Sequence, residues 1–186
     1  MAKQKGNVVT HGLSGKIGGL LVFRQRAGQT IVSGMPVVSN KESASQRAHR
    51  RKFQRAVLYS NAVVADPELG AAYAAKAKPG QSARNVAVAD FFHAPDIELI
   101  DLSGYHGKAG DVIRIEVTDD FIVKEVKVVI TNVDGSIVEE GYAQPEATGY
   151  EWTYKATAEN EILVGDRIEI FASDVPGNIS TETEEL

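Results

Sequence analysis

Basic side chains in the first third of the chain are the residues whose type and spacing point most directly to a chemistry. Seven of them form a candidate interaction site: Lys16, Arg24, Arg26, Arg47, Arg50, Arg51 and Arg55. Guanidinium and ammonium groups in such numbers bind phosphates or carboxylates, so we expect either a nucleic-acid backbone or an acidic protein surface as the partner. Asn and Gln placed to read bases are scarce, so any nucleic-acid binding would be directed to the phosphate backbone.

Catalytic motifs are absent from the sequence. The run from Gly12 to Lys16 has too few residues between its glycines for a phosphate-binding loop, and Ile17 stands where that motif needs Ser or Thr. No G-x-S-x-G elbow occurs, and the lack of cysteine excludes thiol catalysis and thiolate metal sites. None of the four histidines has a second ligand at helical zinc spacing: His11, His49, His93 and His106. The sequence therefore predicts no enzyme, no catalytic residue and no cofactor.

Acidic loop residues offer the one alternative that involves a metal. Asp119, Asp120, Asp134 and Asp174 could meet at loop ends and hold calcium through oxygen ligands. The sequence has no D-x-D-x-D-G loop, and aspartates are common in turns for local reasons. Turn-forming and solvating roles are therefore favoured, and no metal ligand is predicted.

The charge is distributed very unevenly along the 186 residues. The net charge is −5, but residues 1–60 carry eleven Lys or Arg against one acid, whereas residues 95–186 carry six bases against 21 acids. Such asymmetry indicates that the two ends meet different partners or meet each other. The acidic side chains we expect to face the basic site are Glu139, Glu140, Glu182, Glu184 and Glu185.

We predict that a small α+β domain over residues 1–94 positions the basic residues. A strand-like run at 16–24, a turn at 26–29 and a return strand at 30–33 predict a β-hairpin. A lone hairpin is marginal in water, so it must pack on the helices that follow or on another chain.

Three helices are predicted after the hairpin. Ser43 and Gln46 form a capping-box pattern that begins a helix over 43–64, and Asp66-Pro67 begins a second helix over 67–78. A third is expected over 82–92. The apolar face of the first helix should comprise Phe53, Ala56, Val57, Ser60 and Val64, opposite its arginines.

After Pro95 the hydrophobic period changes to two, which indicates strands. Seven are predicted, over 97–102, 112–117, 126–131, 136–142, 150–157, 167–172 and 179–184. Short strands with turns at this spacing are typical of an all-β, immunoglobulin-like sandwich, which we place at residues 95–186 with Trp152 in its core.

Two resemblances cover most of the chain. The segments IRIEV, VKVVITNVDGSIVEEG, EWTY and IEIFASDVPGNIS resemble bacterial immunoglobulin-like modules. The segments SGKIGGLLVFRQRAGQTIVS, QRAHRRKFQRAVLYS and GQSARNVAVADFFHAP resemble a family of uncharacterised proteins from Bacteroidota and their mobile elements. That family is associated with phage-like or structural gene products, so this resemblance implies a structural role and supplies no catalytic residues.

These observations predict a non-enzymatic structural subunit that self-assembles into a particle, tube or filament. Copies of the chain are the expected partner, because opposite charges at the two ends suit a head-to-tail contact. The alternatives are a nucleic-acid-associated protein that uses residues 16–55, and an adhesion or carbohydrate-binding module. With no signal peptide and no apolar run long enough to span a bilayer, we expect no membrane insertion and synthesis in the cytoplasm, with incorporation into a virion or an extracellular assembly left open.

Overall fold

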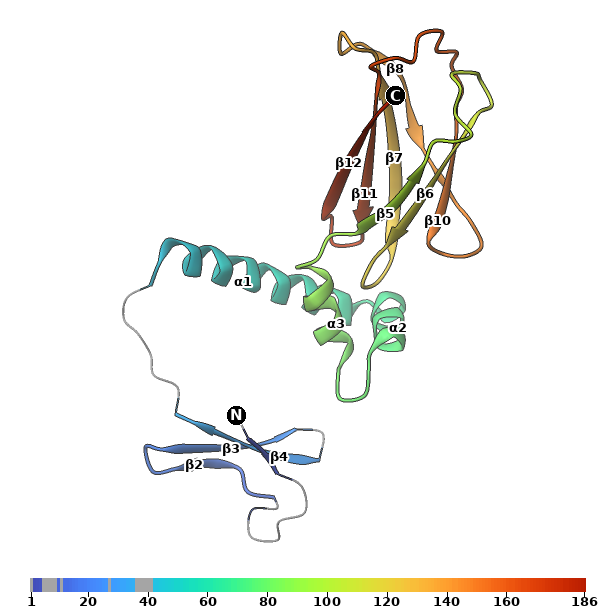
Figure 1. The fold of residues 1–186 in the computed structure, drawn as a ribbon. Helices are drawn as coiled ribbons and strands as arrows, with labels where there is room; N and C mark the ends of the chain where they lie inside the picture. The colour runs from blue at the N-terminus through green and yellow to red at the C-terminus, as the bar shows by residue number, and fades with distance from the viewer. Residues whose placement is uncertain (1, 5–9, 11, 27, 36–41) are drawn as a thin grey trace.

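A computed structural model describes residues 2–4, 10, 12–26, 28–35 and 42–186 (Figure 1). These residues form three helices and twelve strands, and every strand pairing is antiparallel. The fold is therefore mixed α+β with a large β component, and the prediction of helices together with antiparallel sheets is confirmed. Among the described residues, no helix is both long and apolar enough to cross a membrane.

The predicted hairpin, with its turn at 26–29, is present, and two further strands extend it into a four-stranded sheet. Its members are β1 (Ala2–Gln4), β2 (Gly15–Ile17), β3 (Leu21–Arg26) and β4 (Gln29–Gly34), in the order β1-β4-β3-β2. The predicted strand at 16–24 is interrupted because Gly18 takes a positive φ of 57°, a turn conformation that glycine adopts at little cost. β1 pairs with β4 far along the chain, a contact that local sequence does not signal.

The three predicted helices are confirmed, and their local caps explain where they begin. α1 (Ala44–Ala65) begins at Ser43, whose side chain and that of Gln46 complete the capping box. α2 (Pro67–Lys76) begins at Asp66, whose carboxylate accepts from two backbone amides of the first turn. α3 (Ala83–Asp90) begins at Ser82.

The buried face of α1 differs from the predicted one. Ala56, Ser60 and Val63 are buried, whereas Phe53 and Val64 are about half exposed. The buried residues of α1 all lie in its C-terminal half, and the small Ala56 and Ser60 side chains permit close contact with α2 and α3. The predicted face was continued into the outer half of the helix, where residues 44–55 are all exposed and Phe53 lies beside Phe92 without being buried.

The acidic C-terminal region forms two antiparallel sheets, here called the paired sheets. The first has the order β5-β6-β10-β9 and the second β12-β11-β7-β8. Their strands are β5 (Asp96–Asp101), β6 (Val112–Thr118), β7 (Val123–Thr131), β8 (Ile137–Tyr142), β9 (Gln144–Pro145), β10 (Glu151–Lys155), β11 (Arg167–Asp174) and β12 (Ile179–Glu185). All seven predicted strands are present, and the two-residue β9 is the addition.

One apolar core lies between the paired sheets. Alternate residues of β6 and β11 point into it, including Ile113, Ile115, Ile168 and Ile170, all fully buried. Trp152 on β10 is 6% exposed and belongs to this core, so its prediction as a core residue is confirmed.

A second core joins the helices to one end of the paired sheets. Tyr73 of α2 stacks on Phe121 of the β6–β7 turn, with ring centroids 3.6 Å apart. Val63, Val86 and the partly buried Val175 after β11 pack in the same cluster. The helices therefore lie against the end of the sheets where β6, β7 and β11 turn (Figure 1).

Candidate functional site

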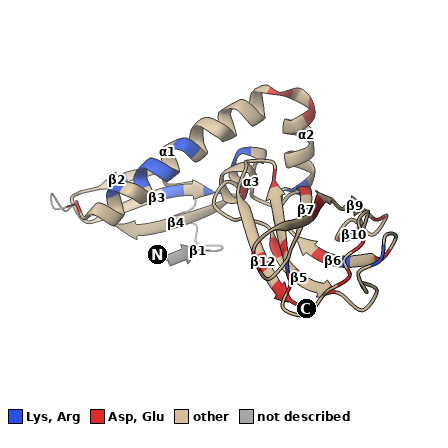
Figure 2. Ribbon diagram, turned by 90° about the horizontal axis from the view of Figure 1, so that it is seen from above, with Lys and Arg blue, Asp and Glu red and all other residues tan. Residues whose placement is uncertain are grey.

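The first half of α1 carries an exposed row of arginines. Residues 44–55 are all solvent-exposed, so three helical turns extend beyond the packed half of the helix. Arg47, Arg51 and Arg55 follow one another at four-residue steps, and we call these three residues the Arg stripe. Together with Lys52 they line a shallow hollow of about 500 Å³. Figure 2 shows these basic residues along the outer half of α1.

The other predicted basic residues have different surroundings. Arg50 pairs with Glu42 at 3.0 Å, on the side of α1 next to the stripe. Lys16, Arg24 and Arg26 are exposed on β2 and β3, so they form a separate basic patch on the N-terminal sheet. Within the part of the chain that the structure describes, Arg47, Arg51 and Arg55 form no ion pair. The Arg stripe is therefore available to an external acidic group.

The five predicted acidic residues do not form one surface, which corrects the sequence expectation. Glu139 is buried, and its Oε2 accepts hydrogen bonds from the Tyr154 hydroxyl at 3.1 Å and from the Thr157 amide at 2.8 Å. Glu182 and Glu184 lie opposite the inward-pointing Ile170 and Ile168, on the core-side face of edge strand β12. Inward-pointing charges on an edge strand discourage pairing with foreign strands.

Glu185 pairs with Arg167 at 3.3 Å, and Glu140 lies on the outer face of the β12-β11-β7-β8 sheet, where two further acids border an apolar groove. The groove measures about 310 Å³ and is lined by Glu125, Lys127, Val129, Tyr142, Glu169, Phe171, Ser173 and Ile179. Cross-strand register places Glu140 beside Val129 on the same face, where its carboxylate pairs with Lys127 at 2.8 Å. This outer face therefore combines an apolar floor with more acids than bases.

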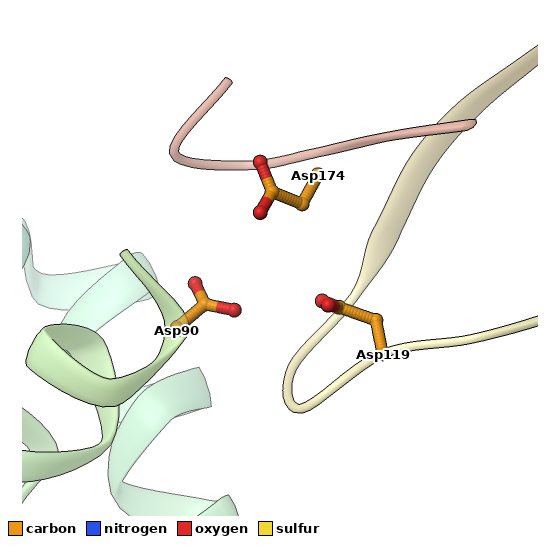
Figure 3. A group of neighbouring side chains, drawn as sticks. All are labelled: Asp90, Asp119 and Asp174. Atoms are coloured by element: carbon orange, nitrogen blue, oxygen red, sulfur yellow. The ribbon is translucent and has the colours of Figure 1, made fainter. Parts of the chain in front are cut away.

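Three aspartates meet where α3 approaches the paired sheets, and we call them the Asp cluster. Asp90 ends α3, Asp119 lies in the β6–β7 turn and Asp174 ends β11. One oxygen from each lies within 4.8 Å of the others, and Figure 3 shows the three carboxylates facing a common space. Asp90 and Asp174 are buried, and Asp119 is partly so.

Burial and mutual repulsion raise the pKa values in this cluster. Loss of water raises the pKa of Asp90 to about 7, and the charges of Asp119 and Asp174 add to this, against a hydrogen bond from the Tyr73 hydroxyl. Burial likewise raises the pKa of Asp119, with the charge of Asp174 as a further cause. The cluster thus concentrates negative charge in a site poor in water.

The sequence located only part of this cluster. Asp119 and Asp174 were in the candidate calcium set, for which turn-forming roles were preferred. Asp120 lies outside the cluster, with its Oδ2 2.5 Å from His93 Nδ1. Asp134 lies in the β7–β8 turn, where its Oδ1 accepts a hydrogen bond from the Ser136 amide. Asp90 was missed, although an acid at the end of the apolar run Val86 to Ala89 is the signal that could have indicated it. His49 stacks near Phe92, His106 donates its backbone amide to Asp111, and His11 lies outside the described residues.

Comparison with known proteins does not assign the chain to a family. A scan of family models and a search of curated proteins found no match. Among solved structures, CopC from Methylosinus trichosporium OB3b is similar at 18% identity, with a TM-score of 0.35 over 49% of this chain and 88% of that one. An engineered protein is similar at 15% identity, with a TM-score of 0.35 over 59% of this chain and 30% of that one.

Proposed function

We propose that this protein is a non-enzymatic structural subunit that assembles with copies of itself, and that the Arg stripe is the main contact element. The observation that carries this proposal is segment 44–55 of α1, in which every residue is exposed and none is buried. A helix of about twelve residues is marginal in water without a packing partner. Three turns of helix that carry free arginines but no core of their own fit an element that is completed by another molecule.

The outer face of the second of the paired sheets is the proposed acceptor on the next copy. Glu125 and Glu169 flank its groove, and Phe171 and Tyr142 supply apolar contact area. Such a contact joins two different surfaces, so it is heterologous and can propagate into a ring or filament. The charges would set orientation and association rate, and the apolar floor would supply affinity.

We further propose that the paired sheets are an immunoglobulin-like sandwich that serves as the scaffold of this contact. The two four-stranded antiparallel sheets around one core support that assignment. The alternative of a carbohydrate-binding module has less support, because Trp152 is buried and offers no exposed aromatic platform.

Sedimentation velocity and negative-stain microscopy of the full chain across a salt series test the proposal. We expect assembly at low salt that weakens as salt screens the charges. The triple variant Arg47→Glu, Arg51→Glu, Arg55→Glu should remain monomeric. A matched control reverses three other exposed bases, Lys76→Glu, Lys78→Glu and Arg84→Glu, and should assemble like the parent.

Two further results decide between assembly and nucleic-acid binding. Adding Glu125→Lys and Glu169→Lys to the Arg-stripe variant should partly restore assembly, because the charges are then exchanged. A parent protein that stays monomeric at low salt, and binds DNA through the same arginines, would replace the proposal with the nucleic-acid alternative.

A further inference from the structure

The Asp cluster has no part in the proposed assembly, and its chemistry points to a ligand of its own. Its three carboxylates come from three separate elements: the end of α3, the β6–β7 turn and the end of β11. They converge at the junction of the helices with the paired sheets (Figure 3).

Two oxygens of the cluster have no partner among the described residues. Oδ1 of Asp90 and Oδ1 of Asp119 are shielded from solvent and accept no hydrogen bond. The Asp90 side chain is wholly buried and points into the cluster. None of the described ion pairs places a Lys, Arg or His on Asp90, Asp119 or Asp174. Buried carboxylates of this kind are costly unless a positive charge compensates them.

The other oxygens are held in place by surrounding donors. The Tyr73 hydroxyl donates its proton to Oδ2 of Asp90. Because that proton is already used, the Tyr59 hydroxyl is the donor in its 2.7 Å hydrogen bond to the Tyr73 hydroxyl oxygen. The Phe121 amide donates to Oδ2 of Asp119 at 3.2 Å. Amides of Gly177 and Asn178 donate to Oδ1 of Asp174 at 2.7 and 2.6 Å. Hydrogen bonds to the far side of a carboxylate orient it in the way that outer partners orient metal ligands.

The donor set and its size select the kind of cation. All three ligands are carboxylates, which hard divalent cations prefer. Oxygens up to 4.8 Å apart can lie on one calcium ion, since two ligands at about 2.3–2.6 Å from Ca²⁺ span at most about 5 Å. Magnesium requires shorter bonds of about 2.0–2.1 Å and near-octahedral geometry, which three side chains from separate elements meet less readily.

We propose that Asp90, Asp119 and Asp174 bind one calcium ion at the junction between the helices and the paired sheets. The ion neutralises the buried carboxylates and links the end of α3 to the β6–β7 turn and to β11. Calcium thereby fixes the orientation of α1, with its Arg stripe, relative to the sheets. This site does not depend on the proposed assembly, because all three ligands belong to one chain.

Calcium titration of the full-length protein after removal of bound metal with a chelator tests the site. We expect one Ca²⁺ per chain by calorimetry, and a thermal midpoint that rises with calcium concentration. Tb³⁺, which takes the same oxygen ligands, should luminesce on tyrosine excitation, because Tyr73 donates directly to Asp90. No binding at about 10 mM Ca²⁺, above the roughly 10⁻⁴–10⁻³ M range of weak extracellular sites, would overturn the proposal.

Matched variants locate the ion. Asp119→Asn should lower calcium affinity by more than the roughly 10- to 100-fold that loss of an outer partner costs. Asp90→Asn provides a second test should the first variant fold poorly. Asp134→Asn alters an exposed turn aspartate and should bind like the parent. Equal calcium affinity of the parent and Asp119→Asn would contradict the assigned ligands. An equal rise of the thermal midpoint with Mg²⁺ and with Ca²⁺ would contradict the choice of calcium.

Discussion

Trp152 packs between the paired sheets, next to its register partner Ile115 on β6. Replacement of a buried tryptophan by alanine removes its apolar contacts and leaves a cavity, so Trp152→Ala should lower the free energy of unfolding by about 3–5 kcal/mol. Urea unfolding followed by circular dichroism measures the loss. Tyr150→Ala, in the exposed turn before β10, is the control and should change stability by no more than about 0.5 kcal/mol. A similar loss in both variants would contradict a core role for Trp152.

Glu139 illustrates why acid counts alone misplace a surface. The sequence reads Val138-Glu139-Glu140, and nothing in it distinguishes the two glutamates. In the structure the strand alternation turns Glu139 inward, where its carboxylate holds the Thr157 segment, and turns Glu140 outward onto Lys127. Because the face of a strand depends on its register, the division of the predicted acidic cluster required the fold.

The Phe121 ring is a buried side-chain link between the helices and the paired sheets. It belongs to the β6–β7 turn but is buried against Tyr73 of α2. Phe121→Ala should lower stability by about 3–5 kcal/mol and separate the melting of the helices from that of the sheets. Differential scanning calorimetry should then show two transitions where the parent shows one.

Phe53→Ala is the control for this effect. Phe53 is 49% exposed in the outer half of α1 and contacts Phe92 at a ring separation of 6.5 Å, so its loss should leave a single transition. Two transitions already present in the parent protein would mean that Phe121 does not couple the two parts.

Elements with local signals were predicted well from the sequence. The caps at Ser43, Asp66 and Ser82 determine where the helices begin, and period-two alternation located seven strands. The pairing of β1 with β4 was missed because its partners are far apart in the chain, and β9 was missed because a strand of two residues is too short to show an alternating pattern. The predicted buried face of α1 was right at Ala56 and Ser60 and wrong at Phe53 and Val64, because periodicity does not say which part of a helix is covered or which of two adjacent valines faces the core.

The candidate sites show the same division between local and long-range information. The Arg stripe was predictable, because four-residue spacing within one helix places side chains on one face. The Asp cluster was not, because Asp90, Asp119 and Asp174 are separated by long stretches of chain and are joined only when α3 docks on the paired sheets. No spacing motif describes such a site.

At the scale of the whole molecule, the sequence divides the chain at residue 95, whereas the buried contacts cross that position. The second core contains residues from α1, α2 and α3 together with Phe121 and Val175. Asn178 also donates from its side chain to the backbone oxygens of Asp90 and His93, at 3.2 and 2.8 Å. The helices and the paired sheets are therefore expected to unfold together.

Two truncated chains test this expectation. A chain of residues 42–186 keeps both cores, so its main thermal transition should match that of the full-length protein. A chain of residues 95–186 exposes Phe121 and Val175 and loses Asp90. Exposing one large apolar side chain costs about 2 kcal/mol, which should lower the midpoint by roughly 8–16 °C in a domain of this size. Calorimetry of both chains at one protein concentration, with and without calcium, provides the measurement. Equal midpoints for the two truncated chains would show that the helices and the sheets are independent, with the boundary near Pro95 that the sequence predicts.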